Sequence, residues 1–160
     1  KIKRRIVPLS YPPSYFRYEQ PIYRNPVFVG LVPYGKEIMP EDTYYITGNL
    51  PLEIMLKLVS KHTIGIGVWE KEGNNYYGDP GKLKLYLACG IPIITTCNNP
   101  TATLIMQTTA GLVISYDKFE LEEAIKEIMA EYDYFKENVK KTWKHINADK
   151  IFRNNKLLEF

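Results

Sequence analysis

Cysteine, long apolar runs and an excess of one charge are all scarce in this sequence, and each shortage excludes a class of protein. The two cysteines, Cys89 and Cys97, flank a predicted strand and fit free thiols better than a disulfide framework. No apolar run approaches the roughly twenty residues of a membrane span, and no signal peptide is visible. Lys and Arg total 21 against 18 Asp and Glu, so the net charge of +3 indicates no nucleic-acid surface. We therefore expect a soluble, cytoplasmic protein with no nucleic-acid partner.

The common phosphate-binding fingerprints are also missing. A Walker loop would need glycine at Tyr76 and Ser or Thr at Leu83. The dinucleotide pattern begins at Gly65 and Gly67 but meets Glu70 where its third glycine belongs. Neither an ATPase nor an NAD enzyme is supported.

The chain does contain the apolar residues of one compact domain. It has 160 residues, of which 45% are hydrophobic, enough for a sizeable core. Five short apolar runs have the pattern of strands buried on both faces of a parallel sheet. These runs are residues 27–31, 43–47, 63–69, 91–96 and 111–115.

Helical patterns alternate with these runs. One apolar stripe follows Pro51, and a second helix begins after the predicted cap Asp79 and stops at Gly90. Asn99 and Pro100 begin a third, which runs through Gln107. A long fourth helix begins at a capping-box-like start, and the residues that form its start and its apolar face are Asp117, Glu120, Leu121, Ile125, Ile128 and Tyr132. The alternation predicts an α/β fold with a doubly wound parallel sheet, although residues 32–42 are barely long enough for a crossover helix.

The loop from Glu70 to Lys82 is the best candidate for a binding site. It leaves one predicted strand and enters a helix, which is where open α/β sheets bind ligands. A helix N-terminus carries unpaired N–H donors and partial positive charge, so the glycine turn before Lys82 favours an anion. A tight loop with a solvated lysine is the alternative interpretation.

Four segments together resemble the GT-B glycosyltransferases. The segment "DPGKLKLYLACGIPII" is similar to the pattern P-x-K-x-x-E-Y-L-A-x-G-x-P-V-I of that family. "FVGLVPYGK" resembles the first strand and glycine loop of its C-terminal domain, "YYITGNLP" its V-x-x-x-G-x-x-P turn, and "TTAGLVISYDKFELEEAIKEIM" its G-L-V strand and acidic-capped helix. The likeness covers about residues 26–132.

The resemblance implies a Rossmann-like domain that forms the C-terminal half of a GT-B architecture. We expect an inter-domain linker over residues 1–26, the nucleotide-sugar-binding domain over 27–132, and C-terminal helices over 133–160. The aromatic residues of the last segment would face a missing N-terminal domain that holds the acceptor. They are Tyr134, Phe135, Trp143, Phe152 and Phe160.

The implied chemistry is transfer of a hexose from a UDP- or GDP-linked donor to a sugar or glycoconjugate, in carbohydrate biosynthesis. The 160 residues alone would transfer no sugar. Carried onto this sequence, the resemblance assigns Lys82, Gly81, Lys36 and Gly30 to the diphosphate, Gly48 and Pro51 to the base and ribose, and Asn98 and Asn99 to the donor sugar. We expect no metal and no cofactor, and no catalytic base is identified.

The sequence departs from the family at two glutamates. Members with the E-x7-E pattern place them at the positions of Tyr77 and Leu85. A sugar-nucleotide-binding module without transfer, or an epimerase-like domain, therefore stays an alternative to a glycosyltransferase, and peripheral membrane association of the full-length protein stays open. The remaining polar candidates are interpreted as structural: Asp79 as a helix cap, and His62 and His145 as non-catalytic.

Overall fold

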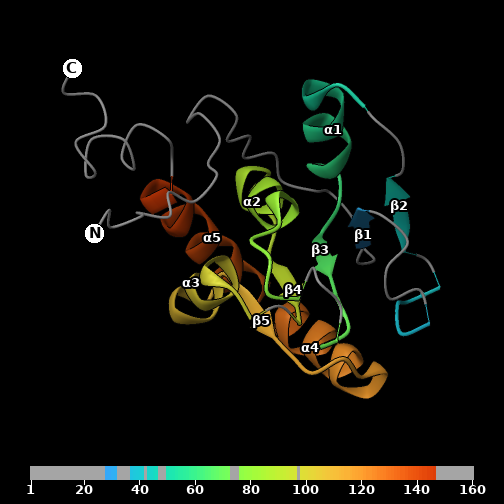
Figure 1. The fold of residues 1–160 in the computed structure, drawn as a ribbon. Coiled ribbons are helices and arrows are strands. Elements are labelled where there is room, and N and C mark those ends of the chain that lie inside the picture. Colours follow the sequence, from blue (N-terminus) through green and yellow to red (C-terminus); the bar gives the residue numbers. More distant parts are fainter. Residues whose placement is uncertain are drawn as a thin grey trace, which may run out of the picture.

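The computed structural model describes residues 28–31, 37–41, 43–46, 50–72, 76–96 and 98–146. They form a parallel five-stranded sheet in the order β2-β1-β3-β4-β5, with helices on both faces (Figure 1). The strands are β1 (Phe28–Leu31), β2 (Tyr44–Ile46), β3 (Ile64–Gly67), β4 (Ile93–Thr95) and β5 (Gly111–Val113). The helices are α1 (Leu52–Val59), α2 (Gly81–Ala88), α3 (Pro100–Thr108), α4 (Lys118–Ala130) and α5 (Tyr132–Ile146). The predicted α/β, Rossmann-like architecture is confirmed.

Every observed strand lies inside one of the predicted apolar runs. The connection between β1 and β2 is the exception to the alternation, because its described residues, 37–41, form turns and no helix. Ile38 and Met39 in these turns are buried with the residues of one sheet face. Two apolar side chains thus cover part of the face that a crossover helix would otherwise cover.

The central strand β3 has a different composition on its two faces. Ile64 and Ile66 belong to the core that also contains α4, whereas Gly65 and Gly67 face α2. A Cβ atom on Gly65 would lie 2.5 Å from the ring of Tyr86, and one on Gly67 would lie 3.0 Å from Leu83. The two glycines, which the sequence could present as the start of a nucleotide fingerprint, are therefore packing positions that let α2 approach the sheet.

Helix α2 is buried along almost its whole length. All residues from Leu83 to Ala88 are buried, and the hydroxyl of Tyr86 donates a hydrogen bond to the carbonyl of Ile66 at 3.2 Å. The helix ends where predicted, because Gly90 has a φ of 74°, which a residue with a side chain rarely adopts. Glycines thus set both how closely α2 approaches β3 and where α2 ends.

The starts of α3 and α4 confirm two predicted caps. Asn99 Oδ1 accepts a hydrogen bond from Ala102 N at 2.8 Å, and Asp117 Oδ1 accepts one from Glu120 N at 2.9 Å. The carboxylate of Glu120 accepts from Ser115 N at 2.7 Å. In a standard capping box Glu120 would accept from the N–H of the N-cap residue, Asp117; here it accepts from the N–H two positions earlier.

The predicted long helix is in fact two helices. Helix α4 ends at Ala130, and Tyr132 begins α5 instead of extending the apolar face of α4. The hydroxyl of Tyr132 donates to the carbonyl of Thr63 at 3.2 Å, just before β3. The prediction that Tyr132 shares a helix with Leu121 is wrong because a tertiary contact, not helical periodicity, fixes its place.

Helix α5 packs against this domain. It contacts α2, α3 and α4, and its residues Phe135 and Trp143 are buried in the two cores. The expectation that these two aromatics face a missing domain is therefore wrong, whereas Tyr134 is 54% exposed. Phe152 and Phe160 lie outside the described residues.

His62 fits the structural role expected for it. It is buried between α1 and β3, its Nδ1 lies 2.9 Å from the carbonyl oxygen of Leu58, and its ring stacks on Tyr44. Burial lowers the pKa of His62 below its ordinary value of 6.5. Within the described ranges, no helix has the length and apolar character needed to cross a membrane.

The close contact of β3 with α2 predicts the effect of a single added methyl group. Gly65→Ala places a Cβ at 2.5 Å from the buried ring of Tyr86, which has no room to move. We expect a loss of about 1 to 3 kcal/mol in the free energy of unfolding, the usual cost of overpacking, measured by urea denaturation. Gly78→Ala, at an exposed loop position, is the control and should leave the midpoint nearly unchanged. Equal midpoints for Gly65→Ala and the parent would show that the glycine is not needed for packing.

Candidate functional site

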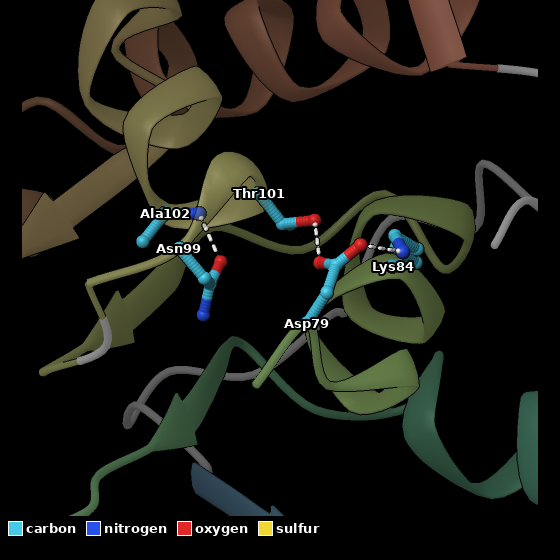
Figure 2. A network of polar contacts seen from close by, with 5 residues as sticks. All are labelled: Asp79, Lys84, Asn99, Thr101 and Ala102. Carbon is cyan, nitrogen blue, oxygen red and sulfur yellow. Dashed lines mark hydrogen bonds and ion pairs between the residues drawn. The ribbon is translucent and has the colours of Figure 1, made fainter. Parts of the chain in front are cut away.

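The carboxyl ends of the strands bring the predicted loop to the edge of the sheet where ligands bind in open α/β folds. The strand order reverses between β1 and β3, and such a switch point is the usual ligand position. The residues that follow β3 lead to α2, and those that follow β4 lead directly to α3. The starts of α2 and α3 are therefore neighbours at this edge (Figure 2).

Helix α2 begins without a side-chain cap. Its N-cap residue is Pro80, with φ −70° and ψ 125°, and no acidic residue lies in its first turn. Gly81 is its first residue and Lys82 its second, as the loop pattern predicts. The prediction that Asp79 caps this helix is wrong, since its carboxylate is bound elsewhere.

Asp79 joins the two helices. Its Oδ2 accepts a hydrogen bond from Lys84 Nζ at 2.6 Å, and its Oδ1 accepts one from Thr101 Oγ1 at 2.5 Å (Figure 2). The side chain of Lys84 is only 2% exposed and that of Asp79 is 26% exposed. A single carboxylate thus ties the loop before α2, the interior of α2 and the first turn of α3 together.

This arrangement changes the local electrostatics at the start of α2. A lone carboxylate beside a helix N-terminus would repel an incoming phosphate. Here the ammonium of Lys84 neutralises Asp79 at contact distance. The carboxylate of Asp79 therefore does not offset the partial positive charge of the helix start.

Lys82 lies beside an aromatic ring at the end of β3. Its Nζ is 5.6 Å from the ring centroid of Trp69, a contact of about 0.5 to 1 kcal/mol in a partly solvated place. Trp69 is held in turn by Thr96, whose Oγ1 accepts from Trp69 N and donates to Trp69 O, both at 2.7 Å. The ends of β3 and β4 are thus locked together under the lysine.

The start of α3 carries the predicted asparagines. Asn98 N donates to the carbonyl of Tyr76 at 3.1 Å, which holds the loop before α2 against the loop after β4. Asn98 is exposed, whereas Asn99 is 5% exposed. Among the side-chain nitrogen and oxygen atoms of the described residues, Asn99 Nδ2 is one of two that are buried without a hydrogen-bond partner.

The structure brings together four of the predicted site residues: Gly81, Lys82, Asn98 and Asn99 lie at the two adjoining helix starts. Pro51 begins α1 after the edge strand β2, and Gly30 lies in β1, so both belong to the same edge but to other connections. Lys36 and Gly48 lie outside the described residues.

The two positions at which the resembled family has glutamates differ in exposure. Tyr77 is 61% exposed, and its ring makes an edge contact with Tyr76. Leu85 is 2% exposed, within the core. A glutamate at Leu85 would therefore be a buried charge in this chain.

The residues that sequence reasoning missed are Lys84, Thr101, Trp69 and Thr96. Lys84 carried a readable signal, since a lysine amid Leu83, Leu85 and further apolar residues must find a counter-charge if the helix is buried. The other three act through contacts between residues at least 22 positions apart. Such contacts leave no local pattern in the sequence.

Comparison with protein families gives a match over most of the chain. The family model for the C-terminal domain of glucosyltransferase 3-like proteins matches residues 45–158. This chain belongs to that family. Comparisons with curated proteins and with solved structures gave no match.

The glucosyltransferase 3-like match includes both helix starts and the Asp79 network, whereas Gly30 and Lys36 precede it. The resemblance to a glycosyltransferase C-terminal domain is thereby confirmed at the level of glycosyltransferases. In the described part of this glucosyltransferase 3-like domain, no three His, Cys, Asp or Glu side chains gather in a group able to bind a metal.

The unequal burial of the ion pair predicts unequal effects of its two partners. Asp79→Asn leaves the ammonium of Lys84 buried without a counter-charge and should cost about 3 to 5 kcal/mol in the free energy of unfolding. Lys84→Met leaves the carboxylate of the more exposed Asp79, which water reaches, and should cost less. The double variant should recover part of the loss from Asp79→Asn. Chemical denaturation of the three variants checks this, and a greater loss for Lys84→Met than for Asp79→Asn would contradict it.

Proposed function

We propose that this chain is the donor-binding domain of a glycosyltransferase with GT-B architecture, and that it holds the diphosphate of a nucleotide sugar at the start of α2. One observation carries the proposal. An N-terminus without a side-chain cap, followed by Gly81 and Lys82, lies at the ligand-binding edge of a glucosyltransferase 3-like domain.

The reaction separates a nucleoside diphosphate from the anomeric carbon of a sugar, and negative charge builds on the departing diphosphate. Oriented N–H groups and a fixed cation stabilise such charge well in a partly dry site. The first turn of α2 supplies the N–H groups, and Lys82 supplies the cation. Neutralisation of Asp79 by Lys84 supports this assignment, because the site then contains no opposing charge from Asp79.

The other donor contacts follow from the remaining connections at the same edge. We assign the loop of Asn98 and Asn99 to the donor sugar, and the turn of Gly48 and Pro51 to the base and ribose. Gly30 and Lys36 are assigned to the diphosphate from the side of β1. The donor carries UDP or GDP.

The acceptor is assigned to a further, N-terminal domain. Positioning two reactants in one cleft is worth up to about 7 to 11 kcal/mol of the barrier, so a donor half by itself forfeits most of the rate. The proposed setting is carbohydrate biosynthesis in the cytoplasm, with the acceptor a sugar or glycoconjugate and the full-length protein either free or peripheral to a membrane.

A second candidate is a domain that binds a sugar nucleotide without transferring the sugar. It is favoured by the state of Asp79, the acidic side chain next to the start of α2. Both of its oxygens accept hydrogen bonds from Lys84 and Thr101, so it is not available as a base for an acceptor hydroxyl.

Lys82→Ala tests the assignment of the diphosphate. Loss of a charge-assisted contact of about 1.5 to 3 kcal/mol should weaken binding of UDP or GDP by roughly ten- to a hundred-fold. Calorimetry on the folded variant measures this. Lys126→Ala removes an exposed lysine from α4 and should leave the affinity unchanged. Unchanged affinity in Lys82→Ala would show that this lysine does not bind the diphosphate.

An assay of two chain lengths separates transferase from binder. We expect no transfer by the 160 residues and measurable transfer of a radiolabelled sugar once the native upstream sequence is added. Product analysis distinguishes transfer from epimerisation. Robust transfer by the isolated chain would overturn the two-domain proposal, and donor binding without turnover in the longer protein would support the binding module.

A further inference from the structure

We propose that the groove between the edge strand β5 and helix α4 binds an extended, basic segment of a partner protein, which adds to the sheet as a further strand. The groove shares no residue with the proposed donor site, and the inference does not depend on the proposed function. It gives the domain a protein-binding surface at the β5 edge of the sheet.

The groove lies on the face of the sheet that α4 covers (Figure 1). Its volume is about 330 Å³. Leu112 and Ile114 of the β5 region pack on the same core as α4 and line the groove, together with Phe119 at the start of the helix. Phe119 is 68% exposed, so apolar surface at the groove remains in contact with water.

Strand β5 has an open edge beside this groove. It is the last strand in the sheet order and pairs only with β4 among the described strands. Ile114 N donates to Thr95 O at 2.9 Å, so the main chain of Ile114 is directed toward β4. The N–H and C=O groups of successive strand residues point to opposite edges, so those of Val113 point outward. An edge of this kind binds another strand through main-chain hydrogen bonds.

The wall that α4 contributes to the groove is acidic. Glu120, Glu123 and Glu127 line it, and their three- and four-residue spacing places them on one helix face. Lys126 Nζ lies 2.6 Å from Glu123 Oε1, but the two side chains are 70% and 51% exposed, so this ion pair is weak and can be exchanged. A second copy of the chain would bring the same carboxylates together. The charge therefore favours a basic partner.

The apolar floor and acidic wall together match the side chains of lysine and arginine. The aliphatic stem of such a side chain packs on apolar surface while its charged head stays at the rim. A strand added to β5 directs every second side chain to the face of Leu112 and Ile114, and hence toward the carboxylates of α4. The partner segment therefore carries lysine or arginine at alternate positions.

The test measures, by fluorescence anisotropy, the binding of a short fluorescein-labelled peptide in which lysine and valine alternate. The whole 160-residue chain is compared with the double variant Glu123→Gln, Glu127→Gln, which nearly keeps the size of both side chains and removes their charge. The control variant Glu122→Gln, Glu131→Gln removes equal charge from exposed positions outside the groove. A peptide in which lysine and proline alternate keeps the charge but is unable to add as a strand.

We expect the groove variant to bind the lysine–valine peptide about five- to thirtyfold more weakly than the parent, from the loss of two exposed charge contacts, and the control variant to stay within about twofold. The lysine–proline peptide should bind the parent at least about fivefold more weakly than the lysine–valine peptide. Saturation with the lysine–valine peptide should also slow hydrogen exchange at the amide of Val113, measured by NMR.

Four results would overturn the inference. The first is a parent chain that does not bind the lysine–valine peptide, and the second is an equal loss of affinity in the groove and control variants. The third is equal affinity for the two peptides with unchanged exchange at Val113, which would mean attraction of charge without an added strand. The fourth is a dimer of the parent that the peptide dissociates, since the groove would then belong to a second copy.

Discussion

The contact between the ring of Tyr86 and the bare backbone of Gly65 is the constraint on which the rest of the structure depends. It sets how closely α2 approaches the central strand, and the hydroxyl of the same tyrosine fixes the helix along the strand through Ile66. A helix held this firmly carries its first turn to a defined place at the sheet edge. Lys82 reaches Trp69, and Asp79 reaches α3, only because the helix behind them is fixed.

The same burial imposes a cost at Lys84, whose charge lies inside an otherwise apolar helix. An ion pair in such a place does not by itself stabilise a fold more than apolar side chains would. The ion pair instead fixes the position of the loop before α2, because the ammonium of Lys84 donates its hydrogen bond to Asp79 in that loop. The position of Asp79, and through it the first turn of α3, follows from satisfying one buried charge.

Much of this architecture could be predicted from the sequence, and the failures have physical reasons. The strands and most helix ends followed from apolar runs, caps and Gly90, all of which are local signals. Asp79 was predicted as a cap from position alone, but its carboxylate forms an ion pair five residues along the chain, inside the helix. Likewise Tyr132 and Trp143 follow tertiary contacts rather than helical periodicity or expected exposure. Gly81 and Lys82 could be placed from sequence because a helix start at a strand end is itself a local feature.

The position of Lys82 over Trp69 gives the domain an optical reporter of its own site. The sequence has two tryptophans, and the other, Trp143, is buried in α5. The emission of an indole depends on the charges and dipoles near its ring. The ammonium of Lys82 lies 5.6 Å from the ring centroid of Trp69, so any event that moves this ammonium changes the fluorescence of Trp69. With Trp143 replaced by phenylalanine, the tryptophan emission would come from one ring at the end of β3, and the occupancy of the helix start could be followed without a label.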